Sequence, residues 1–321
     1  MKQSAVVNTP ARPGTIAASA AVGCPVCGGT EFGAMFGGGA RPTARRNAGA
    51  YRITQSSRAL VGAIQRCRNC GLGLLPPALV DAGHYEEGFD ERFAEQAQVR
   101  IRNAERLLEL LPPPVPGARL LDVGCAYGFL LAAARIEGYT PVGVELSQPA
   151  AEHARQAYGV EVFNGPVQDA PFPPGSFDVI TLSDVIEHFS DPAPVVARLH
   201  QWLRPNGRLL ILTPDAGSVV ARLLGRHWWA LLDDHYWYFS RPTLTRFLAQ
   251  QGFAVERLHS FGRVFPIAHW VFKLSQYNAG VHRLLDRTVR MLGLAETEVP
   301  LNLGDQMACV ARRTDQGRPR R

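Results

Sequence analysis

From Arg119 onward the sequence alternates short apolar segments with amphipathic segments, and this alternation constrains the fold more than any other feature. Strands separated by helices of about ten residues are typical of right-handed crossover units, which build a parallel sheet covered on both faces. The pattern therefore predicts a doubly wound α/β domain with a mostly parallel seven-stranded sheet. The expected strands are residues 119–123, 141–146, 160–163, 177–182, 208–213, 253–261 and 306–312, and the expected helices are 128–138, 148–158 and 191–203.

The cysteines predict a second, smaller unit. Four of the six form two matched CxxC pairs, Cys24 with Cys27 and Cys67 with Cys70, and a glycine follows each pair. This spacing lets both thiolates of a pair face one ion, and two pairs supply the four sulfur ligands of a closed, structural zinc site. An iron–sulfur or redox centre is the alternative. Cysteines used in this way indicate a reducing compartment, so we expect a cytoplasmic protein.

These signals divide the chain into successive segments. A run of three prolines from Pro112 ends a helical pattern, because proline lacks an amide donor. No apolar run is long enough for a transmembrane helix. The expected segments are a disordered tail (1–20), a zinc module (21–80), a helical linker (81–116), the α/β core (117–265), a helical lid or insertion (266–300), a final core strand (301–313) and a basic tail (314–321).

A glycine-containing loop joins the first predicted strand to the first helix. Gly124 lets the backbone approach a ligand, and Gly128 lets the helix begin close to it. Glu145 ends the next strand, where a carboxylate can accept hydrogen bonds from both hydroxyls of a ribose. The spacing departs from the GxGxxG pattern, and no Walker lysine follows, which argues against a bound pyrophosphate or ATP.

With this loop and acid, the chain resembles the class I S-adenosylmethionine-dependent methyltransferases, which have a Rossmann-like fold. In that family a D/E-x-G-x-x-x-G loop holds the methionine moiety of the cofactor and the acid after the second strand holds its ribose. The segment 165–172 is similar to the adenine-contacting loop. The resemblance therefore implies a cofactor site made of Asp122, Gly124, Cys125, Gly128, Glu145, Leu146, Val167, Gln168 and Ser183.

The resemblance extends to a subgroup that acts on sugars and small molecules and carries an N-terminal CxxC…CxxCG module. Its other shared features correspond to Leu75–Pro77, His84–Tyr85, the segment 234–240 and Gly252–Phe253, so the similarity covers about 290 residues. It implies S-adenosyl-L-methionine as cofactor, structural Zn²⁺ and a small-molecule acceptor.

Candidate catalytic residues follow the fourth strand, at the sheet edge where ligands bind in open α/β folds. Asp184, Glu187 and His188 have the spacing of one face of a helical turn. His188 suits a general base, because its side chain titrates near neutral pH. The three could instead hold a divalent ion such as Mg²⁺, since they resemble the E-x-x-E-H motif of metal-dependent O-methyltransferases, with Asp184 in place of the first glutamate. His235, within an aromatic cluster, is the second candidate base.

Several functions fit these features. The favoured one is methyl transfer to a small metabolite, with O-methylation of a sugar, glycan precursor or aromatic compound as the main expectation. The net charge of +6 and a basic amphipathic segment at 266–293 permit an anionic or lipid-linked substrate, or a membrane surface, although a lid or dimer helix is the simpler interpretation. An RNA methyltransferase is less favoured, because the basic residues are not interleaved with aromatic residues. A non-catalytic scaffold is the third possibility, and the sequence leaves the oligomeric state open.

Overall fold

The computed structural model describes residues 23–36, 63–80 and 91–314. The predicted N-terminal tail, His84 and Tyr85, and all but the first residue of the predicted basic tail lie outside these ranges.

A seven-stranded sheet in the order β10-β13-β8-β7-β4-β5-β6 forms the centre of the molecule. Neighbouring strands from β8 to β6 run parallel, whereas β13 is antiparallel to both β8 and β10. This arrangement confirms the predicted doubly wound α/β fold. The strands are β4 (Arg119–Val123), β5 (Thr140–Glu145), β6 (Glu161–Asn164), β7 (Phe177–Ser183), β8 (Leu203–Pro214), β10 (Phe253–Ser260) and β13 (Gln306–Arg313).

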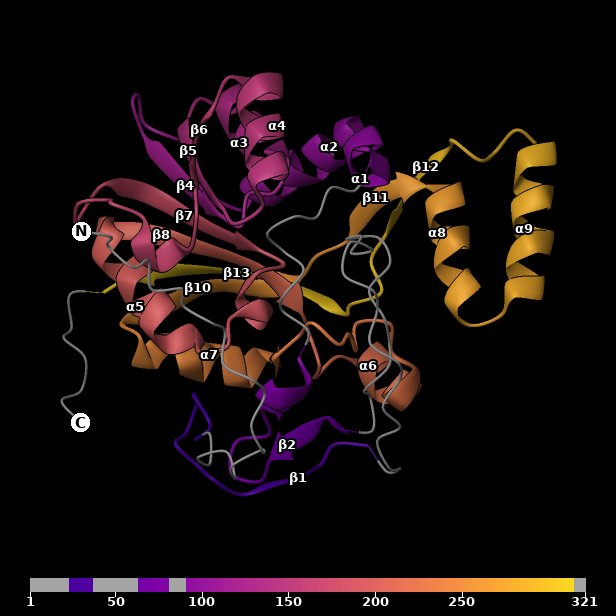
Figure 1. Ribbon diagram of the computed structural model, residues 1–321, viewed down its shortest axis with the longest axis horizontal. Helices are drawn as coiled ribbons and strands as arrows, with labels where there is room; N and C mark the ends of the chain where they lie inside the picture. Colours follow the sequence, from indigo (N-terminus) through magenta and orange to yellow (C-terminus); the bar gives the residue numbers. More distant parts are fainter. Residues whose placement is uncertain (1–22, 37–62, 81–90, 315–321) are drawn as a thin grey trace, which may run out of the picture.

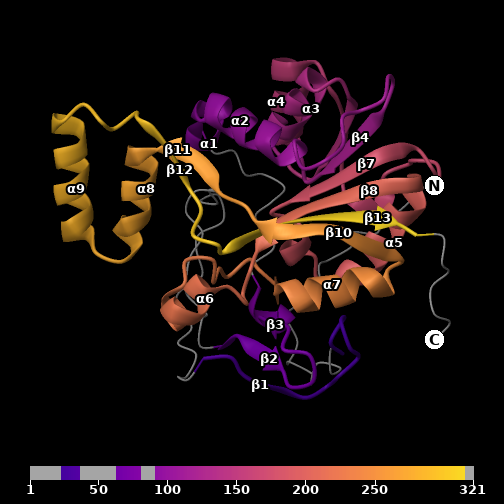
Figure 2. The same cartoon turned by 180° about the vertical axis from the view of Figure 1, so that it is seen from behind.

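Helices cover both faces of the sheet, as Figures 1 and 2 show. One face carries α2 (Ala97–Leu108), α3 (Phe129–Ile136) and α4 (Gln148–Tyr158), and the other carries α5 (Pro192–Trp202) and α7 (Arg241–Gln250). Local sequence fixes the ends of α4: the Ser147 side chain accepts a hydrogen bond from the Ala150 amide, and Gly159 closes the helix with a φ of 60°. Shorter helices are α1 (Glu91–Glu95), α6 (Val219–Leu224), η3 (Pro77–Leu79), η4 (Val167–Asp169), η5 (Ile186–His188) and η6 (Gly225–His227).

The two cysteine pairs belong to a small antiparallel sheet beneath α7 (Figure 1). Its strands are β1 (Phe32–Ala34), β2 (Gln65–Cys67), β3 (Gly73–Leu74) and β9 (Trp237–Tyr238). Val26 and Leu72 of this unit are fully buried in the same apolar cluster as Phe247 of α7. We call the part formed by residues 23–36 and 63–75 the cysteine module. Its core is therefore continuous with that of the main domain.

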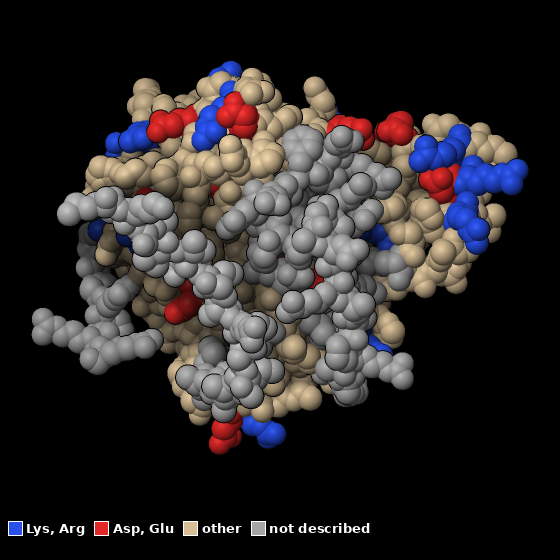
Figure 3. Space-filling view, in the orientation of Figure 1, with Lys and Arg blue, Asp and Glu red and all other residues tan. Residues whose placement is uncertain are grey.

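A helical hairpin projects from one end of the sheet, most clearly in Figure 2. It rises from the two-stranded ribbon of β11 (Arg263–Pro266) and β12 (Glu298–Leu301), and consists of α8 (Ile267–Lys273), η7 (Leu274–Gln276) and α9 (Ala279–Met291). No residue of α9 is buried, and its arginines gather on its surface (Figure 3). Among the described residues, none of the helices has the length and apolar character to cross a bilayer. The predicted roles as lid, dimer helix or membrane contact stay predictions.

Candidate functional site

A cavity of about 1350 Å³ opens at the carboxyl ends of β4, β5 and β7. The parallel strands bring together at this edge residues that are far apart in the sequence. Of the residues predicted to bind the cofactor, those that line the cavity are Gly124, Glu145, Leu146, Val167, Gln168 and Ser183. Asp122, Cys125 and Gly128 lie behind this surface, so the structure places them as supports of the loop.

The two loop glycines are required by the backbone and by their neighbours. Gly124 has a φ of 72°, and a Cβ atom there would lie 2.7 Å from Val185 Cγ2. Gly128 has a φ of 81°, and its Cβ would lie 2.7 Å from the Cβ of Ala154. Any other residue would combine a left-handed backbone with a steric clash. The loop is thus a backbone cradle from which side chains are excluded, which fits the close approach of a ligand.

Glu145 is held in place at both carboxylate oxygens. Its Oε2 accepts a hydrogen bond of 2.7 Å from the Ala126 amide, and its Oε1 accepts one of 2.8 Å from the Ser147 amide. Burial raises the pKa of this carboxyl group, although the amide donors oppose the shift. Glu145 lines the cavity, where a fixed carboxylate can receive the two hydroxyls of a ribose.

Asp122 is buried below the loop. Its Oδ1 accepts a 2.6 Å hydrogen bond from the hydroxyl of Thr181 on β7, and the side chain has almost no contact with solvent. Burial raises the pKa of Asp122 to about 7, the Thr181 hydroxyl opposes this shift, and the charge of Glu145 adds to it. The loop therefore rests on a carboxyl group whose ionisation is easily changed by a nearby charge.

Three titratable side chains meet on the opposite side of the cavity. The ligand-type atoms of Glu187, His188 and His235 all lie within 4.8 Å of one another, and the two imidazole rings are 4.6 Å apart in an edge-to-face arrangement. His188 Nδ1 lies 3.0 Å from the carbonyl oxygen of Asp234. A hydrogen on Nδ1 donates to this carbonyl, which leaves Nε2 as the acceptor nitrogen of a neutral ring.

Glu187 and His235 are both almost completely buried. The Thr213 hydroxyl donates a 2.9 Å hydrogen bond to Glu187 Oε2, whereas Glu187 Oε1 and His235 Nδ1 have no hydrogen-bond partner. Burial raises the pKa of Glu187 to about 7 and lowers that of His235 to about 4. Unpaired polar atoms in a buried place are costly and commonly mark a functional site.

The predicted helical turn across residues 184–188 is not formed, because only Ile186–His188 adopt a short 3₁₀ turn. Asp184 instead has a left-handed backbone with a φ of 54°, and its carboxylate forms an ion pair with Arg263 of β11. Asp184 therefore does not share one face with Glu187 and His188. His235, from the segment after β8, completes the cluster in its place.

Sequence reasoning did not predict the far wall of the cavity. Residues from the ribbon and the hairpin line it, among them Arg263, Phe265, His269, Trp270 and Tyr277. The sequence predicts only a basic amphipathic segment, with a lid as one of its roles, in the part of the chain that contains His269, Trp270 and Tyr277. Nothing in their spacing indicates contact with the cofactor edge, because β11 and α8 reach it only through the fold.

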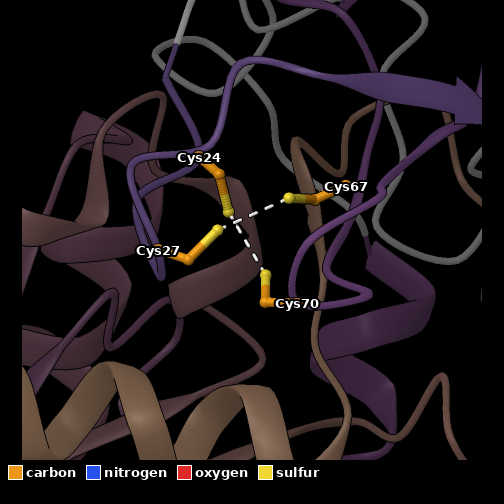
Figure 4. A group of neighbouring side chains, drawn as sticks. All are labelled: Cys24, Cys27, Cys67 and Cys70. Atoms are coloured by element: carbon orange, nitrogen blue, oxygen red, sulfur yellow. Dashed lines mark hydrogen bonds between the residues drawn. The ribbon is translucent and has the colours of Figure 1, made fainter.

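The four module cysteines converge on one point, as Figure 4 shows. The Sγ atoms of Cys24 and Cys70 are 3.4 Å apart and those of Cys27 and Cys67 are 3.5 Å apart. A tetrahedral zinc ion with bonds of about 2.3 Å fits inside such a group. Burial raises the pKa of Cys24. Burial also acts to raise the pKa of Cys67, but hydrogen bonds from the backbone of Cys70 and Asn69 and from the Cys27 and Cys70 side chains together lower it to about 7. A cation would relieve the crowding of these thiolates.

Comparisons with known proteins indicate the family of this chain. A family model described as a methyltransferase domain matches residues 93–258. The chain is 44% identical over 120 residues to nocamycin O-methyltransferase of Saccharothrix syringae, covering 35% of this chain and 42% of that protein. It is 32% identical over 158 residues to a ubiquinone biosynthesis O-methyltransferase of Thiobacillus denitrificans, covering 45% of this chain and 68% of the relative.

A solved structure shows the same fold. A chain from the complex of the Haloferax volcanii Trm112 methyltransferase activator with a methyltransferase matches with a TM-score of 0.53 and 15% identity, covering 70% of this chain and 94% of that one. At this identity the match shows the fold alone. The sheet order, the loop between β4 and α3 and the acid at the end of β5 are those of a class I methyltransferase domain. With the family match over residues 93–258, the chain belongs to the S-adenosylmethionine-dependent methyltransferases.

Proposed function

We propose that this protein transfers the methyl group of S-adenosylmethionine to a hydroxyl oxygen of a small metabolite. The observation that carries the proposal is that the cofactor cradle and the cluster of Glu187, His188 and His235 line one cavity. Bound S-adenosylmethionine supplies an electrophilic methyl group on a sulfonium centre. The matched relatives named O-methyltransferases support oxygen as the accepting atom, although the nocamycin enzyme is matched over less than half of its length.

We assign the role of general base to His188. His188 Nε2 can take the proton of the acceptor hydroxyl while the oxygen forms its bond to the methyl carbon. The Asp234 carbonyl orients the ring through Nδ1, and the adjacent carboxyl group of Glu187, when ionised, stabilises the imidazolium that results. His235 stays neutral near pH 7, because burial lowers its pKa to about 4.

The cluster also fits a divalent ion, which is the alternative use of the same residues. Glu187 Oε1 and His235 Nδ1 are buried without a hydrogen-bond partner, and with His188 they provide three ligand atoms. Two imidazoles and one carboxylate suit Mn²⁺, Fe²⁺ or Zn²⁺ better than Mg²⁺. A bound ion would lower the pKa of an acceptor hydroxyl.

The cavity wall indicates the kind of acceptor. Phe265, Trp270 and Tyr277 offer aromatic surface, and Arg263 offers a positive charge already shared with Asp184. Aromatic side chains contribute large contact areas to the binding of sugar and aromatic rings. We therefore infer an acceptor with an aromatic or sugar ring. The six free thiols fit the cytoplasmic location that we propose.

The proposal is tested by titrating the protein with S-adenosylmethionine in a calorimeter and screening ring-bearing hydroxyl compounds for transfer of a labelled methyl group. His188→Gln should lower kcat by about 10²- to 10⁴-fold and leave the Kd of the cofactor unchanged. Glu145→Ala should instead weaken cofactor binding. A wild-type protein that binds the cofactor without transferring its methyl group to any acceptor would support the scaffold alternative.

The metal content separates the two uses of the cluster. One equivalent of zinc per chain that is unchanged in His235→Asn would support the use of the cluster as a general base. Two equivalents of metal per chain that fall to one in His235→Asn would support the binding of a divalent ion by the cluster.

A further inference from the structure

The cysteine module is joined to the main domain by strand pairing. β3 pairs antiparallel with β9, with Gly73 opposite Tyr238 and Leu74 opposite Trp237. The pairing continues beyond the strands, because the Leu75 amide donates a 2.9 Å hydrogen bond to the carbonyl of Tyr236. A segment from the catalytic domain thus forms the fourth strand of the module sheet.

The same segment contacts the catalytic cluster on its other side. The Tyr236 amide donates a 2.9 Å hydrogen bond to the carbonyl of Glu187, and the indole nitrogen of Trp237 donates one of 2.8 Å to the carbonyl of Phe189. His188 Nδ1 contacts the carbonyl of Asp234. We call residues 234–238 the bridging segment. It lies between β3 and η5, is hydrogen-bonded to both, and carries His235 itself.

We propose that the cysteine module, through β3, is a positioning element that sets the placement of His235 and His188 in the cavity. The inference rests on the proposed function of that cluster. Its consequence is that a loosened module should impair the chemical step while cofactor binding, which depends on β4 and β5, persists. Cys24, Cys27, Cys67 and Cys70 would hold the metal that keeps β3 in place.

The size of the elements explains why the segment needs this support. β3 and β9 have two residues each, and so short a pair is not stable by itself. The bridging segment also follows the stretch 215–233, whose only helices are the short α6 and η6, so fixing its backbone costs considerable entropy. The compensating free energy comes from two sources. One is the burial of Leu75, Trp237 and Tyr238, which are all nearly fully buried, and the other is a structural metal site.

The sharpest perturbation is Gly73→Val. A Cβ at Gly73 would lie 2.8 Å from the Cβ of Tyr238, which is not the movable end of a side chain, so β3 and β9 must separate. Gly33→Val is the matched control in the same module. Gly33 lies on the outer strand β1, where the nearest atom to a Cβ is 3.5 Å away on the Arg68 side chain.

We expect Gly73→Val to retain its zinc, to bind S-adenosylmethionine within about twofold of wild type, and to lose about 10- to 100-fold in kcat through misplacement of the cluster. Gly33→Val should keep kcat. Hydrogen–deuterium exchange should show faster exchange in residues 185–189 and 234–238 of Gly73→Val, with residues 119–128 unchanged. Removing zinc from wild type with a chelator should reproduce the pattern.

Two results would overturn the inference: full kcat in Gly73→Val, or a loss of kcat accompanied by an equal loss of cofactor binding. Should Gly73→Val fail to fold, zinc removal from wild type decides the matter by the same exchange and binding measurements. The exchange experiment needs no acceptor. Failure of the proposed methyl transfer is therefore distinguishable from failure of the positioning role.

Discussion

The buried carboxyl group of Asp122 should make the protein less stable as pH rises. The pKa of Asp122 is about 7 in the folded chain, against 3.8 for an ordinary aspartate. Between these values the unfolded chain releases a proton that the folded chain keeps, so ionisation favours unfolding. The free energy of unfolding should fall across this window by about 4 kcal/mol and remain level above it, because each pKa unit corresponds to about 1.4 kcal/mol.

Asp122→Asn removes this titration and keeps an oxygen that can accept the hydrogen bond from Thr181. The variant should match wild type most closely near pH 4 and exceed its stability increasingly towards pH 8, by an amount on the order of the same 4 kcal/mol. Urea unfolding of both proteins at matched pH gives the difference, in which the contributions of all other titrating groups cancel.

Thr181→Val serves as the control for this reasoning. It removes the hydroxyl that opposes the pKa shift, so the pKa of Asp122 should rise further and the window should extend to higher pH. A stability difference between Asp122→Asn and wild type that stays constant from about pH 4 to about pH 8 would refute the account, because it would mean that the carboxyl group titrates equally in both states.

Two further substitutions test the surroundings of the cavity. Gly128→Ala should lower the free energy of unfolding, measured by thermal unfolding, by about 1–3 kcal/mol more than Gly175→Ala does. Both glycines have a left-handed backbone, but only at Gly128 would a Cβ lie against Ala154. Equal losses of stability in the two variants would contradict the steric argument. Arg263→Met should raise the KM of an anionic acceptor about tenfold and change stability by less than about 1 kcal/mol, since the ion pair with Asp184 is partly exposed. An unchanged KM in acceptor titrations would show that Arg263 does not contact the acceptor.

Much of the geometry at the proposed cofactor site was predictable because it depends on local rules. A left-handed position that tolerates no side chain calls for glycine, so Gly124 and Gly128 are visible in the sequence. Glu145 was predictable because an acid at the end of a parallel strand must lie at the ligand-binding edge. The spacing of the cysteine pairs likewise predicts that four sulfur atoms will meet.

The catalytic cluster was predicted only in part. His188 and Glu187 were expected to share a helical turn with Asp184, but the backbone of Asp184 is left-handed and its carboxylate pairs with Arg263. Arg263 lies 79 residues further along the chain, and no sequence pattern links the two. Asp184 still lines the cavity, but its carboxylate pairs with a residue from a distant element and is not part of the cluster of Glu187, His188 and His235.

The sequence by itself determined the doubly wound sheet, the cofactor loop and the cysteine pairs, because each follows from the period of apolar residues or from the geometry of a few adjacent residues. The tertiary structure alone decided that His235 joins Glu187 and His188, that α8 lines the cavity, and that β3 pairs with the segment carrying His235. These contacts join elements of widely separated sequence. They depend on how whole layers pack, which no local pattern encodes.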